Sequence, residues 1–214
     1  FSYDTRNRAI FPDRGMLQRV SAELALPSFG DSVQFFKLNY RAQWFYPVYR
    51  DFIFSVKGDA GFGEGILGTD ALPFFENYYA GGPRTVRGYE ENTLGPRDSF
   101  GRAKGGNIKI VAGVEITLPV PFLKELDSVR ITGFFDAGNV WCSDDTVRSG
   151  LLLAPVPNCR DEDRFDLGDL RYSAGISGIW ISPFGMVSVS ISQAIGDKPG
   201  DEVQSFQFTF GQSF

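Results

Sequence analysis

The segment Phe206-Gln207-Phe208-Thr209-Phe210-Gly211-Gln212-Ser213-Phe214 decides the fold class, because apolar and polar side chains alternate along it. Side chains of a β-strand point alternately to its two faces, so the first three phenylalanines share one face while Gln207 and Thr209 share the other. One face suits lipid and the other suits water. An aromatic residue such as Phe214 at the end of this alternation is typical of the last strand of a membrane β-barrel.

The same alternation recurs along the chain and predicts nine strands. In the clearest, 32–46, six apolar side chains from Phe36 to Tyr46 alternate with polar ones such as Lys37 and Arg41. Most of the candidates are long enough to cross a bilayer at barrel tilt, which takes about 9–11 residues. The nine expected strands are 1–6, 16–27, 32–46, 51–64, 106–118, 128–140, 170–181, 186–194 and 206–214. We therefore expect an all-β fold, a transmembrane antiparallel β-barrel.

Composition excludes several classes of protein. The chain has 21 Phe and 25 Gly, and no apolar run approaches the roughly 20 residues that a membrane helix needs. A net charge of -5 without a Lys/Arg cluster argues against nucleic acid. The absence of His removes most acid-base and zinc chemistry, so we expect no enzyme, no cofactor and no metal. A formal G-x-G-x-x-G match at 63–68 has no helix pattern after it, which disfavours nucleotide binding.

The connections alternate in length and predict the orientation of the barrel. Short turns are expected at 47–50, 119–127 and 182–185, and long connections at 65–105 and 141–169. In bacterial barrels the short turns are periplasmic and the long loops extracellular. Segment 141–169 is therefore expected to be an extracellular loop. It contains Cys142 and Cys159, an even count that favours a disulfide in an oxidising compartment.

The number of strands predicts that the wall is incomplete. Nine is odd, whereas single-chain bacterial barrels have an even number of strands. The chain also opens at Phe1 in what looks like the middle of a strand. We therefore expect a C-terminal fragment from which earlier strands are missing.

Segment 65–105 is longer than ordinary connections, and loops of that length are usually functional or disordered. It is aromatic and rich in Gly, so we expect it to fold back and pack inside the barrel. Arg87 would then need carboxylates, which Glu115 and Asp136 can supply from the polar faces of the next two strands. One guanidinium can bond two carboxylates. The alternative is that Arg87 is a solvated loop residue.

Several motifs in order carry a resemblance. They are Phe75-Glu76-Asn77-Tyr78-Tyr79-Ala80-Gly81-Gly82, Val86-Arg87-Gly88-Tyr89, Asn92-Thr93-Leu94-Gly95-Pro96, Val114-Glu115-Ile116-Thr117-Leu118-Pro119 and Phe134-Phe135-Asp136-Ala137-Gly138-Asn139-Val140-Trp141. Together, over about residues 10 to 214, the chain resembles the BamA family, the central subunits of the bacterial outer-membrane protein assembly machinery. Tyr89 stands where the family more often has Phe, and the chain ends in Phe214 where the family has Trp.

The resemblance implies a 16-stranded barrel preceded by POTRA domains, of which residues 1–214 supply the last nine strands. It also implies that 65–105 is a lumenal loop whose motif Val86, Arg87, Gly88 and Tyr89 places Arg87 in a bridge to Glu115 and Asp136. The implied location is the bacterial outer membrane. The implied partners are outer-membrane lipid, client β-barrel proteins and accessory lipoproteins, the last mainly through the POTRA domains.

The function expected from this resemblance is the assembly and insertion of β-barrel proteins through a weak seam between the first and last strands. A client strand could add to an exposed edge there by β-augmentation. The expected seam residues are Phe206, Phe208, Phe210, Gly211 and Phe214. The alternative is a polypeptide-secreting pore of the same superfamily, of the two-partner secretion or TamA-like kind. Five POTRA domains upstream would favour assembly, and two would favour secretion.

Overall fold

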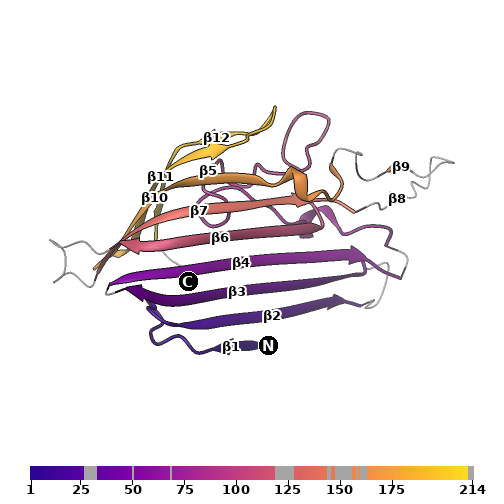
Figure 1. Cartoon of the computed structure of the whole chain (residues 1–214). Coiled ribbons are helices and arrows are strands. Elements are labelled where there is room, and N and C mark those ends of the chain that lie inside the picture. Colours follow the sequence, from indigo (N-terminus) through magenta and orange to yellow (C-terminus); the bar gives the residue numbers. More distant parts are fainter. Residues whose placement is uncertain are drawn as a thin grey trace.

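The computed structural model describes residues 1–26, 33–49, 51–67, 69–118, 128–143, 146–147, 156–157, 159 and 163–211. These residues form one nine-stranded antiparallel sheet in which the strands follow one another in chain order (Figure 1). The order is β1-β2-β3-β4-β6-β7-β10-β11-β13. Among the described residues, no helix has the length and apolar character needed to cross a membrane.

The nine strands of this sheet correspond to those expected from the alternation, although β1 has only three residues. They are β1 (Ser2–Asp4), β2 (Gly15–Ala25), β3 (Phe35–Tyr49), β4 (Phe52–Gly65), β6 (Ile108–Leu118), β7 (Val129–Trp141), β10 (Arg171–Ser182), β11 (Gly185–Ile195) and β13 (Phe206–Phe210). Four shorter strands form two pairs, β5 (Gly88–Tyr89) with β12 (Val203–Gln204) and β8 (Thr146–Val147) with β9 (Val156–Pro157). Two short 3-10 helices, Phe74–Glu76 and Leu167–Asp169, complete the described elements. The expectation of an all-β antiparallel fold is confirmed.

The turn predicted at 47–50 is wrong in its extent. Strand β3 continues to Tyr49, and β4 begins at Phe52. The register shifts between Pro47 and Tyr49, as at a β-bulge. A bulge tolerates a proline, which has no N–H for the ladder, so Pro47 does not end the strand.

The two faces of the sheet differ sharply. One face, here called the outer face, exposes large apolar side chains that lie in register across neighbouring strands, such as Tyr46 beside Phe54 and Val114 beside Phe135. The other, the inner face, is covered by the long connection between β4 and β6. Here lies the buried core, made of Tyr78, Ala80, Val86, Tyr89, Leu94, Val111 and Val140. A sheet with its apolar residues exposed on one side and its core on the other suits a wall between lipid and a packed interior.

The connection after β7 is joined by a disulfide between Cys142 and Cys159, whose Cα atoms are 6.0 Å apart. Phe165, further along this connection, packs edge-on against Trp141, with ring centroids 5.1 Å apart. These contacts hold the described parts of the connection against the end of β7. Its extracellular position stays a prediction.

We expect a charge at the centre of the outer face to destabilise the protein in a bilayer. Ile176 lies midway along β10 and is 59% exposed on this face. Ile176→Arg should lower the free energy of unfolding by about 2–4 kcal/mol, because a cation would face hydrocarbon. Reversible urea unfolding in lipid vesicles measures this difference, with Ile176→Leu as the matched apolar control. Equal stability of the Arg and Leu variants would contradict the assignment of this face to lipid.

Candidate functional site

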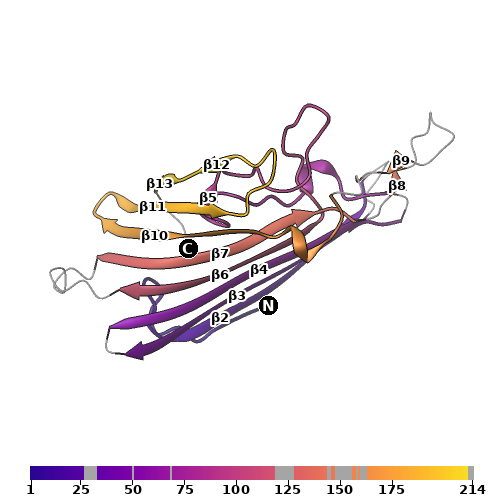
Figure 2. The same ribbon diagram turned by 45° about the horizontal axis from the view of Figure 1, so that its top comes forward.

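The long connection between β4 and β6 packs on the inner face of the sheet. Its Tyr78 stacks on Gly61 of β4, where a Cβ atom would come within 2.7 Å of the Tyr78 ring. Backbone bridges join Tyr78 to Gly106 and Ala80 to Leu94, so the connection is folded on itself. Figure 2 shows its short strand β5 on the same side of the sheet as β12, above β11. The connection is therefore part of the core rather than a surface loop.

Arg87 contacts both carboxylates that the sequence suggested. Its Nε donates to Asp136 Oδ2 at 2.6 Å, and its Nη2 donates to Asp136 Oδ1 at 2.9 Å and to Glu115 Oε1 at 2.6 Å. The backbone N–H of Arg87 also donates to Asp136 Oδ2 at 3.3 Å. Asp136 is completely buried. A bidentate pair of this kind fixes both the position and the orientation of the loop.

Sequence reasoning missed two further members of this site. Lys57 of β4 lies with its Nζ 3.2 Å from Glu115 Oε1 and 3.4 Å from Asp136 Oδ1. The ring of Phe134 lies under the guanidinium of Arg87, with its centroid 3.5 Å from Cζ, in cation–π geometry. We call Lys57, Arg87, Glu115 and Asp136 the ion cluster. It holds two cations and two carboxylates, so its formal charges cancel.

Strand register explains why Lys57 belongs to the ion cluster. Lys57 pairs with Gly113, and Gly113 pairs with Asp136, so the three residues form one row across β4, β6 and β7. A Cβ atom on Gly113 would lie 2.5 Å from both Asp136 Oδ1 and Lys57 Cε. The glycine thus leaves the room in which the two side chains meet. The polar parity of Lys57 was visible in the sequence, but its place in this row depends on the pairing of three strands.

Arg87 keeps its charge in this buried position. Burial by itself would lower the pKa of Arg87, but the hydrogen bonds and charge of Asp136, and then of Glu115, outweigh burial and raise the pKa. Among the described residues there is no group of His, Cys, Asp and Glu that could hold a metal ion. The paired charges of the ion cluster hold the loop in position on the sheet.

The residues beside Arg87 are placed by the same packing. Val86 and Tyr89 are fully buried, and the Tyr89 hydroxyl donates to the carbonyl of Tyr172 at 3.2 Å. Gly88 has a φ of +89°, a conformation that residues with a Cβ rarely adopt, and its missing Cβ would lie 3.2 Å from Ser173 Cβ. The motif 86–89 therefore lies close to the wall at β10.

The residues proposed for the seam lie at one edge of the sheet. Phe206, Phe208 and Phe210 are each 59% exposed on the outer face, opposite Ile191, Val189 and Val187 of β11. Strand β13 ends before Gly211, whose φ is +92°. Phe214 lies outside the described residues. On the inner face Gln207 is only 3% exposed, so it faces the packed loop and not water as the alternation suggested.

We expect removal of Arg87 to destabilise the protein strongly. Arg87→Ala removes both guanidinium bonds to the buried Asp136, which then keeps, among the described residues, the Lys57 ammonium and the N–H of residue 87. Breaking a buried ion pair on one side costs roughly 3–5 kcal/mol. The loss is measured as the change in the free energy of unfolding in lipid vesicles, with heat-modifiable gel mobility as a second readout.

Arg102→Ala is the matched control for this prediction, because Arg102 lies in the same loop, pairs with Asp98 and is largely exposed. It should change little. Adding Asp136→Asn to Arg87→Ala should recover part of the loss, since the unpaired charge is then gone. Stability of Arg87→Ala equal to that of Arg102→Ala would show that the cluster does not hold the loop.

Gly113 provides a second test of the ion cluster. Gly113→Ala should lower the free energy of unfolding by about 1–3 kcal/mol, because the new methyl group overlaps two members of the cluster. The control is Gly133→Ala on β7, where the nearest contact for a Cβ is Ile116 Cγ2 at 3.6 Å. A methyl group that fits there should be neutral or slightly stabilising. Equal effects of the two substitutions in urea unfolding would contradict the packing described here.

Comparison with known proteins places these observations in a family. The model of the Omp85 superfamily domain matches residues 1–214. The outer membrane protein assembly factor BamA of Neisseria meningitidis is 38% identical over 96% of this chain and 27% of its own length. The human sorting and assembly machinery component 50 homolog is 34% identical over 64% of this chain and 29% of its own length. The chain thus spans little more than a quarter of the length of these relatives.

A solved structure agrees with the fold. The crystal structure of BamA from Haemophilus ducreyi lacking POTRA domains 1-3 superposes with a TM-score of 0.79 at 27% identity. The match covers 97% of this chain and 40% of that one. Because the family model spans the whole chain and the nine-stranded sheet agrees with that of a solved relative, the chain belongs to the Omp85 superfamily.

Proposed function

We propose that this chain is the C-terminal part of a β-barrel in the bacterial outer membrane, and that the barrel assembles and inserts other β-barrel proteins. Relatives from a bacterium and from human are both named as assembly components, and they match the chain at 38% and 34% identity. Nothing in the ion cluster calls for a reaction, which fits an assembly factor better than an enzyme. In this proposal residues 65–105 are a lumenal loop and 141–169 an extracellular one.

The observation that carries the proposal is the short pairing of the last strand. Strand β13 pairs with β11 over five positions, 206–210 with 187–191, whereas β10 and β11 pair over eleven. In the described part of the chain its other edge has no partner strand. An unpaired strand edge is a template for another chain, and a client strand can add to it by main-chain hydrogen bonds.

The central strands of the described wall are held more firmly than β13. The ion cluster joins β4, β6 and β7 to the loop through Arg87. Strands β3 and β4 pair along nearly their whole length, from Phe35 opposite Gly65 to Tyr49 opposite Phe52. Strand β13 pairs over five positions, more than the three of β1 with β2 but fewer than any other neighbouring pair of the nine-stranded sheet. At the C-terminal end of the wall, opening is therefore easiest at β13. We propose that β13 meets the first strand of the complete barrel in a seam that opens for clients.

The outer face suggests one partner, and the resemblance to the family suggests the others. The aromatic outer face, with Trp44, Trp180 and the phenylalanines of β13 exposed, would contact outer-membrane lipid. Accessory lipoproteins would bind mainly to POTRA domains preceding the barrel. Client strands would approach at the edge of β13, beside the lipid.

Locking the seam tests the function. In the complete barrel, Thr209→Cys would be paired with a cysteine at the facing position of the first strand. Oxidation should abolish the assembly of client barrels into lipid vesicles, and reduction should restore it. The background should be Cys142→Ser with Cys159→Ser, so that reduction acts on the new bond alone.

The control is a lock elsewhere in the wall, between Ser177→Cys and Ser190→Cys, which are direct partners on β10 and β11. This lock should leave client assembly unchanged, because those strands stay paired throughout. Client assembly at the normal rate with the seam locked would refute the proposed function.

A further inference from the structure

The segment before the last strand leaves the wall and joins the loop. Strand β12 pairs with β5, with Val203 opposite Tyr89 and Gln204 opposite Gly88. The adjacent Glu90 N–H donates to the carbonyl of Glu202 at 2.8 Å. Residues 202–204 thus belong to the sheet of the loop, while residues 206–210 belong to the wall.

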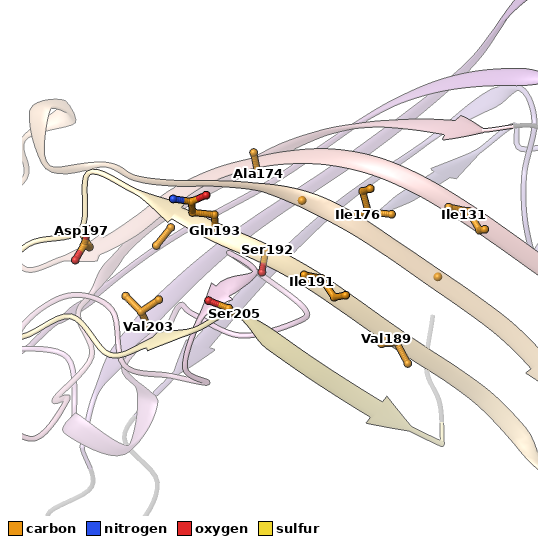
Figure 3. Close-up of a pocket in the computed structure, with 13 residues that line it drawn as sticks. Ile131, Ala174, Ile176, Val189, Ile191, Ser192, Gln193, Asp197, Val203 and Ser205 are labelled. Atoms are coloured by element: carbon orange, nitrogen blue, oxygen red, sulfur yellow. The ribbon is translucent and has the colours of Figure 1, made fainter.

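The crossing point between the two sheets is Ser205. Its carbonyl accepts a hydrogen bond from Ser192 N–H of β11 at 2.9 Å, and Figure 3 shows the two residues side by side. Beyond this bond β12 turns away from β11, and a surface hollow lined by Ile191, Ser192, Val203 and Ser205 lies between them (Figure 3). The end of β11 beyond Ser192 is therefore little supported by the terminal segment.

One side chain ties the last strand back to the loop. The Gln207 Nε2 donates to the carbonyl of Tyr89 at 2.7 Å, and its Oε1 accepts from the N–H of Gly88 at 3.4 Å. These bonds span 118 and 119 residues of sequence. Gln207 is buried, so water does not readily replace the loop as its partner. A primary amide suits this position because it both donates and accepts.

The partners of Gln207 directly follow Arg87 in the chain. Arg87 is fixed by Asp136 and Glu115, so Gly88 and Tyr89 have little freedom to move. The ion cluster therefore restrains β13 indirectly. It fixes Arg87, the backbone extends this restraint to Gly88 and Tyr89, and the Gln207 amide connects these two residues to β13. The outer face offers β13 no comparable hold, since its three phenylalanines are exposed.

We infer that Gln207 is a positioning residue that latches the last strand to the loop, so that the ion cluster sets how readily the seam opens. This inference rests on the proposed seam function and adds a way in which opening of the seam is regulated. Opening β13 toward a client would require the Gln207 amide to leave Tyr89 and Gly88. A loosened loop would free the strand, although Arg87 never touches it.

The test is hydrogen exchange of segment 206–210 in the complete protein in lipid vesicles. Gln207→Met keeps the size and length of the side chain and removes both bonds. Exchange in 206–210 should become roughly tenfold faster, because a buried hydrogen-bonding group of the loop loses its partner. Exchange in 129–141 should stay unchanged, since the ion cluster is intact.

The matched control is Thr209→Val, on the same face of the same strand. Among the residues that the structure describes, the Thr209 side chain has no hydrogen bond, so this substitution should leave exchange in 206–210 unchanged. Unaltered exchange in Gln207→Met, or equal acceleration in both variants, would overturn the inference.

A second measurement separates a latch from a merely structural role. If Gln207 acts through the loop, Gln207→Met should add little to the exchange rate when Arg87→Ala has already loosened the loop. Additive effects of the two substitutions would overturn the inference, because independent sites add. Neither measurement uses a client protein, so the latch and the proposed assembly function can fail separately.

Discussion

The ion cluster is the constraint on which the rest of the inner face depends. A long connection can pack against a sheet only if its polar groups find partners there. Asp136, completely buried, accepts three hydrogen bonds from Arg87. Lys57 balances the second carboxylate, so the cluster buries no net charge. Glycine at 113 leaves space for it. Removing any one of the four charges leaves the cluster with one charge that is not balanced.

The strands could be predicted from the sequence because their alternation is local. One face of each strand contacts lipid and the other a packed interior, so apolar and polar side chains alternate along the strand. This alternation alone placed Glu115 and Asp136 on the face where Arg87 would need them. The resemblance to a known family then pointed to the bridge. The residues of the chain were enough for these steps because each concerns one strand at a time.

What the sequence could not supply depends on distant pairing. Lys57 joins the cluster only through the register of three strands, and β12 is a two-residue strand whose partner β5 is equally short. The alternation placed Gln207 on the inner face correctly but did not reveal what covers that face. It was assigned to water, and it lies instead against the loop. The end of the chain at Phe214 remains a matter of prediction.

The bonds between Gln207 and the loop also bear on the order in which the barrel forms. The loop can dock only after β6 and β7 have brought Glu115 and Asp136 together, and its contact with β13 spans more than half of the chain. Contacts between residues so far apart form late in folding, because closing long loops costs entropy. The last strand would therefore reach its final position only against a docked loop. A wall with a misplaced loop would hold its final strand only by the short pairing with β11, so correct docking of the loop would serve as a check on the maturation of the barrel.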